Sequence, residues 1–137
     1  MRTLHRKEFD ALLVDLDGVI TKTATVHAAA WKKLFDEFLK KRSASMNQPY
    51  KPFDRDREYR SYVDGLPRYK GVETFLQSRG ISLPYGTPED NPERETVCGL
   101  GNRKNQYFQE TLHANGVELY EPAVDFVRNA KSHGFKC

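Results

Sequence analysis

Two short segments suit strands of a parallel β-sheet, and a long, mostly helical stretch separates them. Ala11–Val14 is apolar without alternation and ends at Asp15, which is typical of a strand buried on both faces. Phe135–Cys137 looks like the beginning of a second strand. Parallel neighbours normally need a single crossover helix, whereas this crossover is roughly 115 residues long. The length predicts an α/β fold with an inserted helical subdomain.

Apolar residues at helical spacing predict five helices within this crossover. Their expected positions are about 23–42, 54–65, 68–80, 102–116 and 122–134. Thr23, Thr25, Asp54 and Asn102 are candidate caps at the starts of helices, and glycines end four of them. Pro122 occupies a favoured first-turn position of the last helix.

The bulk composition is that of a globular domain. Hydrophobic residues make up 38% of the 137 residues and charged residues 30%. The net charge of +3 is small and the charges are mixed, so we expect no nucleic-acid partner, although an anionic small molecule suits it.

The cysteines and the apolar runs indicate in which cellular compartment the protein is expected. Cys98 and Cys137 form neither a disulfide framework nor a zinc motif, so we expect free thiols in a reducing cytosol. The N-terminus lacks the apolar core of a signal peptide, and no apolar run approaches the roughly 18 residues that span a bilayer. A cytoplasmic protein without a membrane partner is the expectation.

Two aspartates are the candidate catalytic groups. Asp15 and Asp17, followed by Gly18, stand directly after the first predicted strand, and ligands in open α/β sheets gather at the carboxyl ends of strands. One carboxylate there can attack phosphorus and the other can move a proton. Both suit Mg²⁺, a hard cation that prefers oxygen ligands, and Gly18 lets the backbone approach a phosphate. A plain turn is the alternative, because Asp and Gly are common turn residues.

The longer run around the aspartates is more specific. Leu13–Thr21 (LVDLDGVIT), followed by Thr23, His27 and Trp31, resembles the haloacid dehalogenase (HAD) superfamily. Within that superfamily it is similar to the β-phosphoglucomutase group.

The resemblance continues in the helical part and covers nearly the whole chain. Asp64–Arg68 (DGLPR), which contains Gly65, and Gly101–Asn105 (GNRKN) look like the substrate loops of that group's helical cap. The resemblance implies the N-terminal part of a HAD-like Rossmannoid α/β core with an inserted all-helical cap. It assigns 1–20 to the first core strand and nucleophile loop, 21–116 to the cap, and 117–137 to the returning core helix and second strand.

The resemblance also implies roles in the core. Asp15 would be the nucleophile that becomes phosphorylated and a ligand of Mg²⁺. Asp17 would be the general acid–base, with its backbone carbonyl also reaching the metal. Gly18 would lend its backbone N–H to the transferring phosphoryl group.

Other roles implied by the resemblance fall on the cap and its hinge. Thr23, His27 and Lys104 would help to position Asp17 on closure. Arg68 would hold the phosphate that is not transferred. The sugar would be supported by Asn105 and, through the first substrate loop, by Gly65.

Each of these side chains also has an ordinary structural explanation. Thr23 can simply cap a helix, and His27 lies one turn before Trp31, where it can pack. Arg68 and Lys104 can be solvated surface residues, although a planar guanidinium suits bidentate phosphate binding. For Trp31 we expect packing rather than chemistry.

Three positions depart from the group's pattern. Val14 precedes the nucleophile where phenylalanine is usual, which should change only packing. Lys22 stands where an acidic residue is usual, and Asp64 where the mutases often carry lysine. Asp64 in place of lysine removes a positive charge near the sugar phosphate, so the pattern does not fix which sugar phosphate is the substrate.

The superfamily also needs a later Ser or Thr, a lysine and an acidic pair, which lie beyond residue 137. We therefore expect a truncated chain that is inactive by itself. The expected function of the intact protein is interconversion of β-glucose 1-phosphate and glucose 6-phosphate by a monomer. A sugar-phosphate phosphatase and a non-catalytic fragment are the alternatives.

Overall fold

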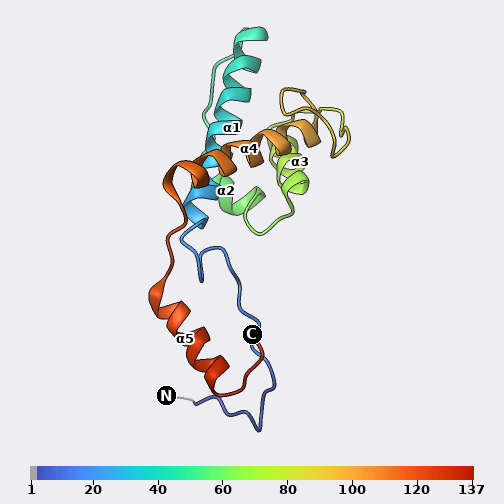
Figure 1. Ribbon diagram of the computed structural model, residues 1–137. Helices are drawn as coiled ribbons and strands as arrows, with labels where there is room; N and C mark the ends of the chain where they lie inside the picture. The colour runs from blue at the N-terminus through green and yellow to red at the C-terminus, as the bar shows by residue number, and fades with distance from the viewer. Residues whose placement is uncertain (1–2) are drawn as a thin grey trace. The chain divides into compact units, whose positions relative to one another are not determined.

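The computed structural model describes residues 3–137, and the regular structure in this range is helical (Figure 1). The helices are α1 (Ala24–Ser45), α2 (Arg57–Tyr62), α3 (Arg68–Ser78), α4 (Val97–Asn115) and α5 (Glu121–Ser132). Each lies where the apolar spacing predicts a helix, although α4 begins earlier than expected. None of the helices in this range has the length and apolar character needed to cross a bilayer.

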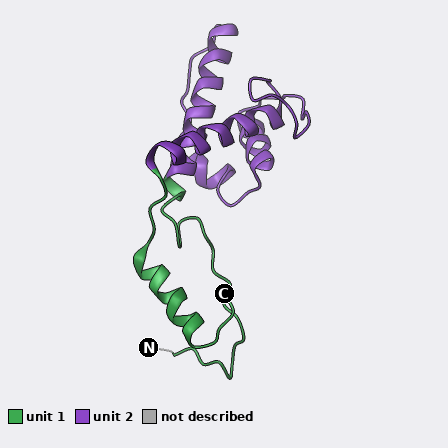
Figure 2. Ribbon diagram, viewed as in Figure 1, with its two compact units in different colours: residues 1–25, 116–137 green, residues 26–115 purple. Residues whose placement is uncertain are grey.

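The chain divides into two compact units, which Figure 2 colours separately. Unit 1 combines Met1–Thr25 with Gly116–Cys137, and unit 2 is the continuous segment Val26–Asn115. The chain therefore leaves unit 1 once, forms the whole of unit 2, and then returns. The domain boundaries at residues 20 and 116 stay a prediction, because a compact unit need not be a domain that folds by itself.

Aromatic side chains form the centre of unit 2. The ring of Phe35, on α1, lies 4.0 Å from that of Phe75, on α3, and 5.1 Å from that of Phe53, measured between centroids. The buried members of the cluster are Trp31, Leu34, Phe35, Phe38, Leu39, Phe53, Val63, Val72, Phe75, Leu76, Val97 and Leu100. Burial of each large side chain contributes about 1.5–3 kcal/mol, so packing stabilises these helices more than their propensity does.

The start of α4 corrects the sequence-based expectation. Asn102 does not cap this helix, which begins at Val97, and the hydroxyl of Thr96 accepts a hydrogen bond from the backbone N–H of Gly99 at 2.9 Å. Glycines disfavour helix interiors and hid this first turn in the sequence. Here they are required by space, since a Cβ at Gly99 would lie 2.2 Å from the carbonyl oxygen of Arg94.

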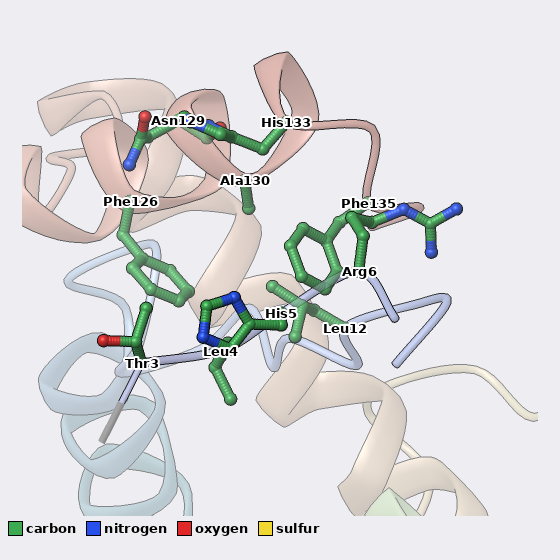
Figure 3. Close-up of a pocket in the computed structure, with 10 residues that line it drawn as sticks. All are labelled: Thr3, Leu4, His5, Arg6, Leu12, Phe126, Asn129, Ala130, His133 and Phe135. Atoms are coloured by element: carbon green, nitrogen blue, oxygen red, sulfur yellow. The ribbon is translucent and has the colours of Figure 1, made fainter. Parts of the chain in front are cut away.

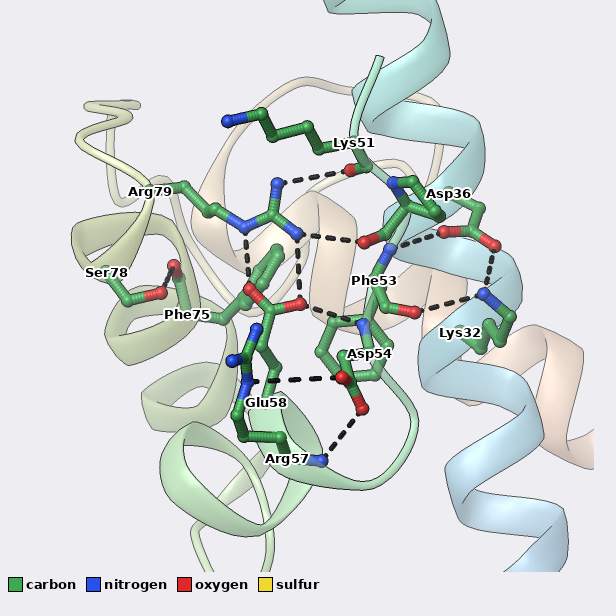
Figure 4. Close-up of polar contacts among 11 residues, drawn as sticks. Lys32, Asp36, Lys51, Phe53, Asp54, Arg57, Glu58, Phe75, Ser78 and Arg79 are labelled. Atoms are coloured by element: carbon green, nitrogen blue, oxygen red, sulfur yellow. Dashed lines mark hydrogen bonds and ion pairs between the residues drawn. The ribbon is translucent and has the colours of Figure 1, made fainter.

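An ion-pair network holds the segment that leads into α2 (Figure 4). Glu58 is paired with Arg79 at 2.7 Å, and Arg79 also donates to the carbonyl oxygens of Lys51 and Pro52. Burial alone would raise the pKa of Glu58, but the hydrogen bonds from Arg79 and the backbone of Asp54 outweigh it and lower that pKa. The network thus joins α2, the end of α3 and the preceding loop.

The start of α2 also differs slightly from expectation. Asp54 does accept backbone hydrogen bonds from Asp56 and Arg57, at 2.9 and 2.8 Å, as a helix-capping side chain would. The regular helix nevertheless begins only at Arg57, so Asp54 organises the turn before it.

Unit 1 contains single β-bridges in place of the predicted strands. Within the described residues of this unit, Ala11 forms a parallel bridge with Lys136, and Thr21 an antiparallel bridge with Leu119. The expectation of a buried strand at Ala11–Val14 is wrong for this structure, because Leu13 is fully exposed and Val14 is 37% exposed. A strand with one bridging neighbour has neither the ladder nor the covering layer that would bury it.

An apolar groove of about 610 Å³ runs along α5 in unit 1 (Figure 3). Side chains that line it include Leu12, Phe126, Ala130 and Phe135, and Figure 3 shows them facing a common space. Ala130 and Phe135 are buried, whereas Phe126 is half exposed. The helix thus has an apolar face that this unit covers only in part.

Candidate functional site

A tight loop carries the two aspartates of unit 1. The carbonyl oxygen of Leu16 accepts hydrogen bonds from the backbone N–H groups of Ile20 and Thr21, both at 3.0 Å. Gly18 has a φ of +77°, a left-handed conformation that L side chains rarely adopt, and its N–H donates to the carbonyl of Thr21 at 2.8 Å. The glycine is therefore required by the turn itself.

Two buried threonines support Asp17. The hydroxyl of Thr23 donates to Oδ1 of Asp17 in a short hydrogen bond. The hydroxyl oxygens of Thr21 and Thr23 lie 2.8 Å apart, and that of Thr21 also donates to the carbonyl of Leu16 at 3.1 Å. The two threonines are only 7% and 5% exposed. A buried hydroxyl pair therefore fixes one oxygen of an exposed carboxylate.

Asp15 is exposed, and its Oδ1 accepts a hydrogen bond from the backbone N–H of Leu16 at 2.9 Å. The residues described contain no cluster of three or more His, Cys, Asp or Glu side chains suited to a metal ion. Asp15 and Asp17 supply carboxylate oxygens, the ligand type that Mg²⁺ prefers, so this donor set fits the predicted cation in kind.

A buried lysine lies in unit 2. Lys104, on α4, is 5% exposed, and its Nζ is 2.7 Å from Nδ1 of His27, on α1. The same ammonium lies 5.0 Å from the ring centroids of Trp31 and Phe108, and His27 stacks on Phe108 with centroids 3.9 Å apart. Lys104 is therefore not a solvated surface residue.

Arg68 begins α3 and is half-buried. Its Nη2 donates to the hydroxyl of Tyr69 at 3.1 Å and to Oδ1 of Asn102 at 3.4 Å. Its buried Nε has no hydrogen-bond partner in the described structure. The unsatisfied Nε and the planar guanidinium make Arg68 a candidate for binding an anion.

The other predicted site residues are less closely involved. Gly65 has a φ of +72° in an exposed turn, and a Cβ added there would meet nothing within 4 Å. Asn105 is half-buried on α4, one residue after Lys104. Trp31 is buried in the core of unit 2, as expected for a packing residue.

The structure therefore brings predicted site residues together in pairs within each unit. Asp17 meets Thr23 in unit 1, and His27 meets Lys104 in unit 2. The sequence reasoning missed Thr21, although its alternation with Thr23 was visible. It also missed the contacts of Asn102 and Tyr69 with Arg68, for which spacing gives no signal.

No family model matches the chain. Among curated proteins, a β-phosphoglucomutase of Mycobacterium bovis is 45% identical over 124 residues, which are 90% of this chain and 47% of that protein. A β-phosphoglucomutase of Bacillus subtilis is 33% identical over 114 residues, 83% of this chain and 42% of that protein. An uncharacterized glycosyl hydrolase of Mycobacterium tuberculosis is 37% identical over 134 residues, 98% of this chain and 10% of that protein.

The chain thus spans about half the length, or less, of the curated relatives that it matches. The alignments cover most of the chain and so include both units.

Proposed function

We propose that this protein, whose resemblance to the β-phosphoglucomutase group these relatives confirm, transfers a phosphoryl group on a sugar phosphate. The observation that carries the proposal is the loop of unit 1, in which Asp17 is held by Thr23 two residues after the exposed Asp15. Two carboxylates at this spacing can divide nucleophilic attack and proton transfer between them.

Asp15 would attack the phosphorus atom and become the phospho-aspartate. As the bond from phosphorus to the sugar oxygen breaks, Asp17 would give a proton to that leaving oxygen. It would take a proton from the accepting sugar hydroxyl when this attacks the phospho-aspartate and frees the carboxylate of Asp15. The backbone N–H of Gly18, expected to bind the phosphoryl group, instead donates to the carbonyl of Thr21, so Gly18 would serve by holding the tight turn that carries the two carboxylates. The hydrogen bond from Thr23 supports this division of roles, because it orients one of the two carboxylates and leaves the other exposed.

Asp15 and Asp17 would also hold Mg²⁺, the cofactor proposed here. The cation, when bound, would offset the negative charge of phosphate and carboxylates as they approach each other. The oxygen-only character of the donors supports this assignment over a transition metal.

Unit 2 would contribute cations for a second phosphate. A mutase must hold the phosphate that is not reacting, and the half-buried guanidinium of Arg68, whose Nε has no protein partner in the described residues, would hold it. The contact between His27 and Lys104 joins α1 and α4 of the same unit. Asn105 and Gly65 would contact the sugar. We therefore propose a β-phosphoglucomutase acting on β-glucose 1-phosphate, a small-molecule substrate, with a phosphatase as the competing reaction on the same scaffold.

Phosphorus NMR on the intact protein, rather than on the 137-residue chain alone, with β-glucose 1-phosphate, Mg²⁺ and a trace of the bisphosphate tests the proposal. Formation of glucose 6-phosphate supports the mutase. Release of inorganic phosphate without isomer formation would establish the phosphatase instead, and an unchanged spectrum would contradict both.

Arg68→Ala separates the two reactions further. It should cripple isomer formation while leaving the hydrolysis of a small monophosphate ester nearly unchanged, because only the mutase needs a second phosphate held. Equal loss in both assays would mean that Arg68 supports the fold of unit 2 instead.

A further inference from the structure

Asn102 connects three parts of unit 2. Its Nδ2 donates to the carbonyl oxygens of Pro88 and Asp90, at 3.0 and 2.9 Å, and these residues belong to the loop before α4. Its Oδ1 accepts from the hydroxyl of Tyr69 at 2.8 Å and from Nη2 of Arg68 at 3.4 Å. The amide orientation is fixed by these partners, since a flip would turn its oxygen toward two carbonyl oxygens.

Tyr69 completes the contact from α3. Its hydroxyl also accepts from Nη2 of Arg68 at 3.1 Å, and the guanidinium carbon lies 5.0 Å from its ring centroid. Gly101 makes this approach possible, because a Cβ there would lie 2.7 Å from Cδ1 of Tyr69 and 3.3 Å from Cγ of Arg68. A glycine on α4 therefore lets the start of α3 lie directly against it.

These contacts hold one nitrogen of Arg68, Nη2, and leave another, Nε, without a partner among the described residues. Nη2 is engaged by Tyr69 and Asn102, while the structure of residues 3–137 shows no protein partner for Nε. A long side chain otherwise loses considerable rotamer entropy when it binds a ligand. Fixing one edge of the guanidinium before binding removes part of that cost.

We propose that Asn102 and Tyr69 are positioning residues for Arg68, which hold its guanidinium ready for an anionic group of the phosphate class. The ligand class rests on the proposed function, whereas the positioning rests on the contacts themselves. Through Pro88 and Asp90, the loop before α4 sets the orientation of Asn102 and so of Arg68.

The test is NMR of the arginine Nε–Hε signals in the complete 137-residue chain, with Arg68→Lys used to assign the Arg68 signal. In the unsubstituted chain we expect slow exchange of this proton with water, because Nε is buried. Tyr69→Phe and Asn102→Ala should each speed that exchange by about tenfold, the effect of losing one hydrogen bond to a charged group. Exchange unchanged in both variants would overturn the proposal.

Tyr107→Phe is the matched control. Tyr107 is another half-buried tyrosine of unit 2, and its hydroxyl donates to Glu37 rather than to a residue beside Arg68. Tyr107→Phe removes a hydroxyl oxygen, as Tyr69→Phe does, but it should leave the exchange of the Arg68 Nε proton unchanged. An equal response to both tyrosine substitutions would show a general loosening of unit 2 and would contradict a specific positioning role.

A titration with inorganic phosphate then separates this inference from the proposed function. The Arg68 signal should shift on titration, and Tyr69→Phe should weaken the apparent affinity by about tenfold, because the guanidinium is no longer held before binding. If the two substitutions change the exchange rate of the Arg68 Nε proton but phosphate does not shift its signal, the positioning is supported and the phosphate role of Arg68 is contradicted.

Discussion

At the scale of single residues, the chemistry proposed for unit 1 depends on two carboxylates with different surroundings. Asp15 is exposed and bonded only to the adjacent backbone N–H in the described contacts, whereas Asp17 is tied to a buried threonine pair. The difference suits a nucleophile that must reach a substrate and a proton-transfer group that must keep its orientation.

Asp15→Asn should abolish turnover in the phosphorus NMR assay, because an amide is a poor nucleophile and a poor metal ligand. Asp10→Asn is the control, since Asp10 is an exposed aspartate of the same unit that pairs with Arg6 at the surface. Turnover of Asp15→Asn within about tenfold of the unsubstituted protein would contradict the assignment.

Asp17→Ala should slow transfer by about 10²–10⁴, the range for losing a general acid–base. Thr23→Val keeps the carboxylate and removes its buried donor, so we expect a smaller loss of kcat, about tenfold. Thr25→Val, at an exposed position two residues later, should have no effect. If Thr23→Val and Thr25→Val behave alike, the hydrogen bond to Asp17 has no part in the rate.

The sequence predicted the identity of several site residues better than their surroundings. The run of Asp15, Asp17 and Gly18 is local, so a short motif can indicate it. The contact between His27 and Lys104 joins residues 77 positions apart. Pairing over that distance follows from the packing of α1 against α4, which spacing alone does not reveal.

At the scale of the elements, periodicity predicted α1, α3 and α5 well because their apolar positions recur at helical spacing. The start of α4 was missed because Gly99 and Gly101 read as helix breakers, although both are needed for close contacts. The strand at Ala11–Val14 was predicted from its composition. Composition indicates what a segment would do inside a sheet, but it does not supply the neighbouring strands.

The pair of Glu58 and Arg79 makes the stability of unit 2 depend on pH. The folded pKa of Glu58 lies below its ordinary value of 4.5, so the contribution is present above that value and is lost as the pH falls through the folded pKa. Glu58→Gln should lower the free energy of unfolding near neutral pH by about 1–3 kcal/mol. It should also flatten the loss of stability below about pH 4.5.

Denaturant unfolding followed by circular dichroism at several pH values measures both effects. Asp56→Asn is the control, because its pair with Arg60 is on the surface and should contribute little. A free energy of unfolding that is equal for Glu58→Gln and Asp56→Asn would show that the buried pair adds nothing to stability.

At the scale of the whole molecule, the two units differ in how well they are packed. Unit 2 has a continuous aromatic core, whereas unit 1 exposes Leu13, Leu16 and Phe126 and contains an apolar groove. Stability is then expected to be uneven along the chain, with the segment around the aspartates at the low end.

Hydrogen exchange on the 137-residue chain should therefore show strong protection in α1 and α3 and little at residues 11–17. We expect protection factors to differ by about a hundredfold or more between the two groups. Uniformly strong protection across residues 11–17 in a monomer would contradict this expectation. It would also contradict the interpretation that unit 1 is less well packed than unit 2.

The two cysteines give a simple chemical means of following that difference. Cys98 is fully buried on α4, and burial raises the pKa of its thiol, whereas Cys137 is exposed. A maleimide reagent should thus modify a single sulfur while unit 2 stays closed, because the thiolate is the reactive form. The appearance of doubly modified chains over time would then report how often α4 separates from its neighbours.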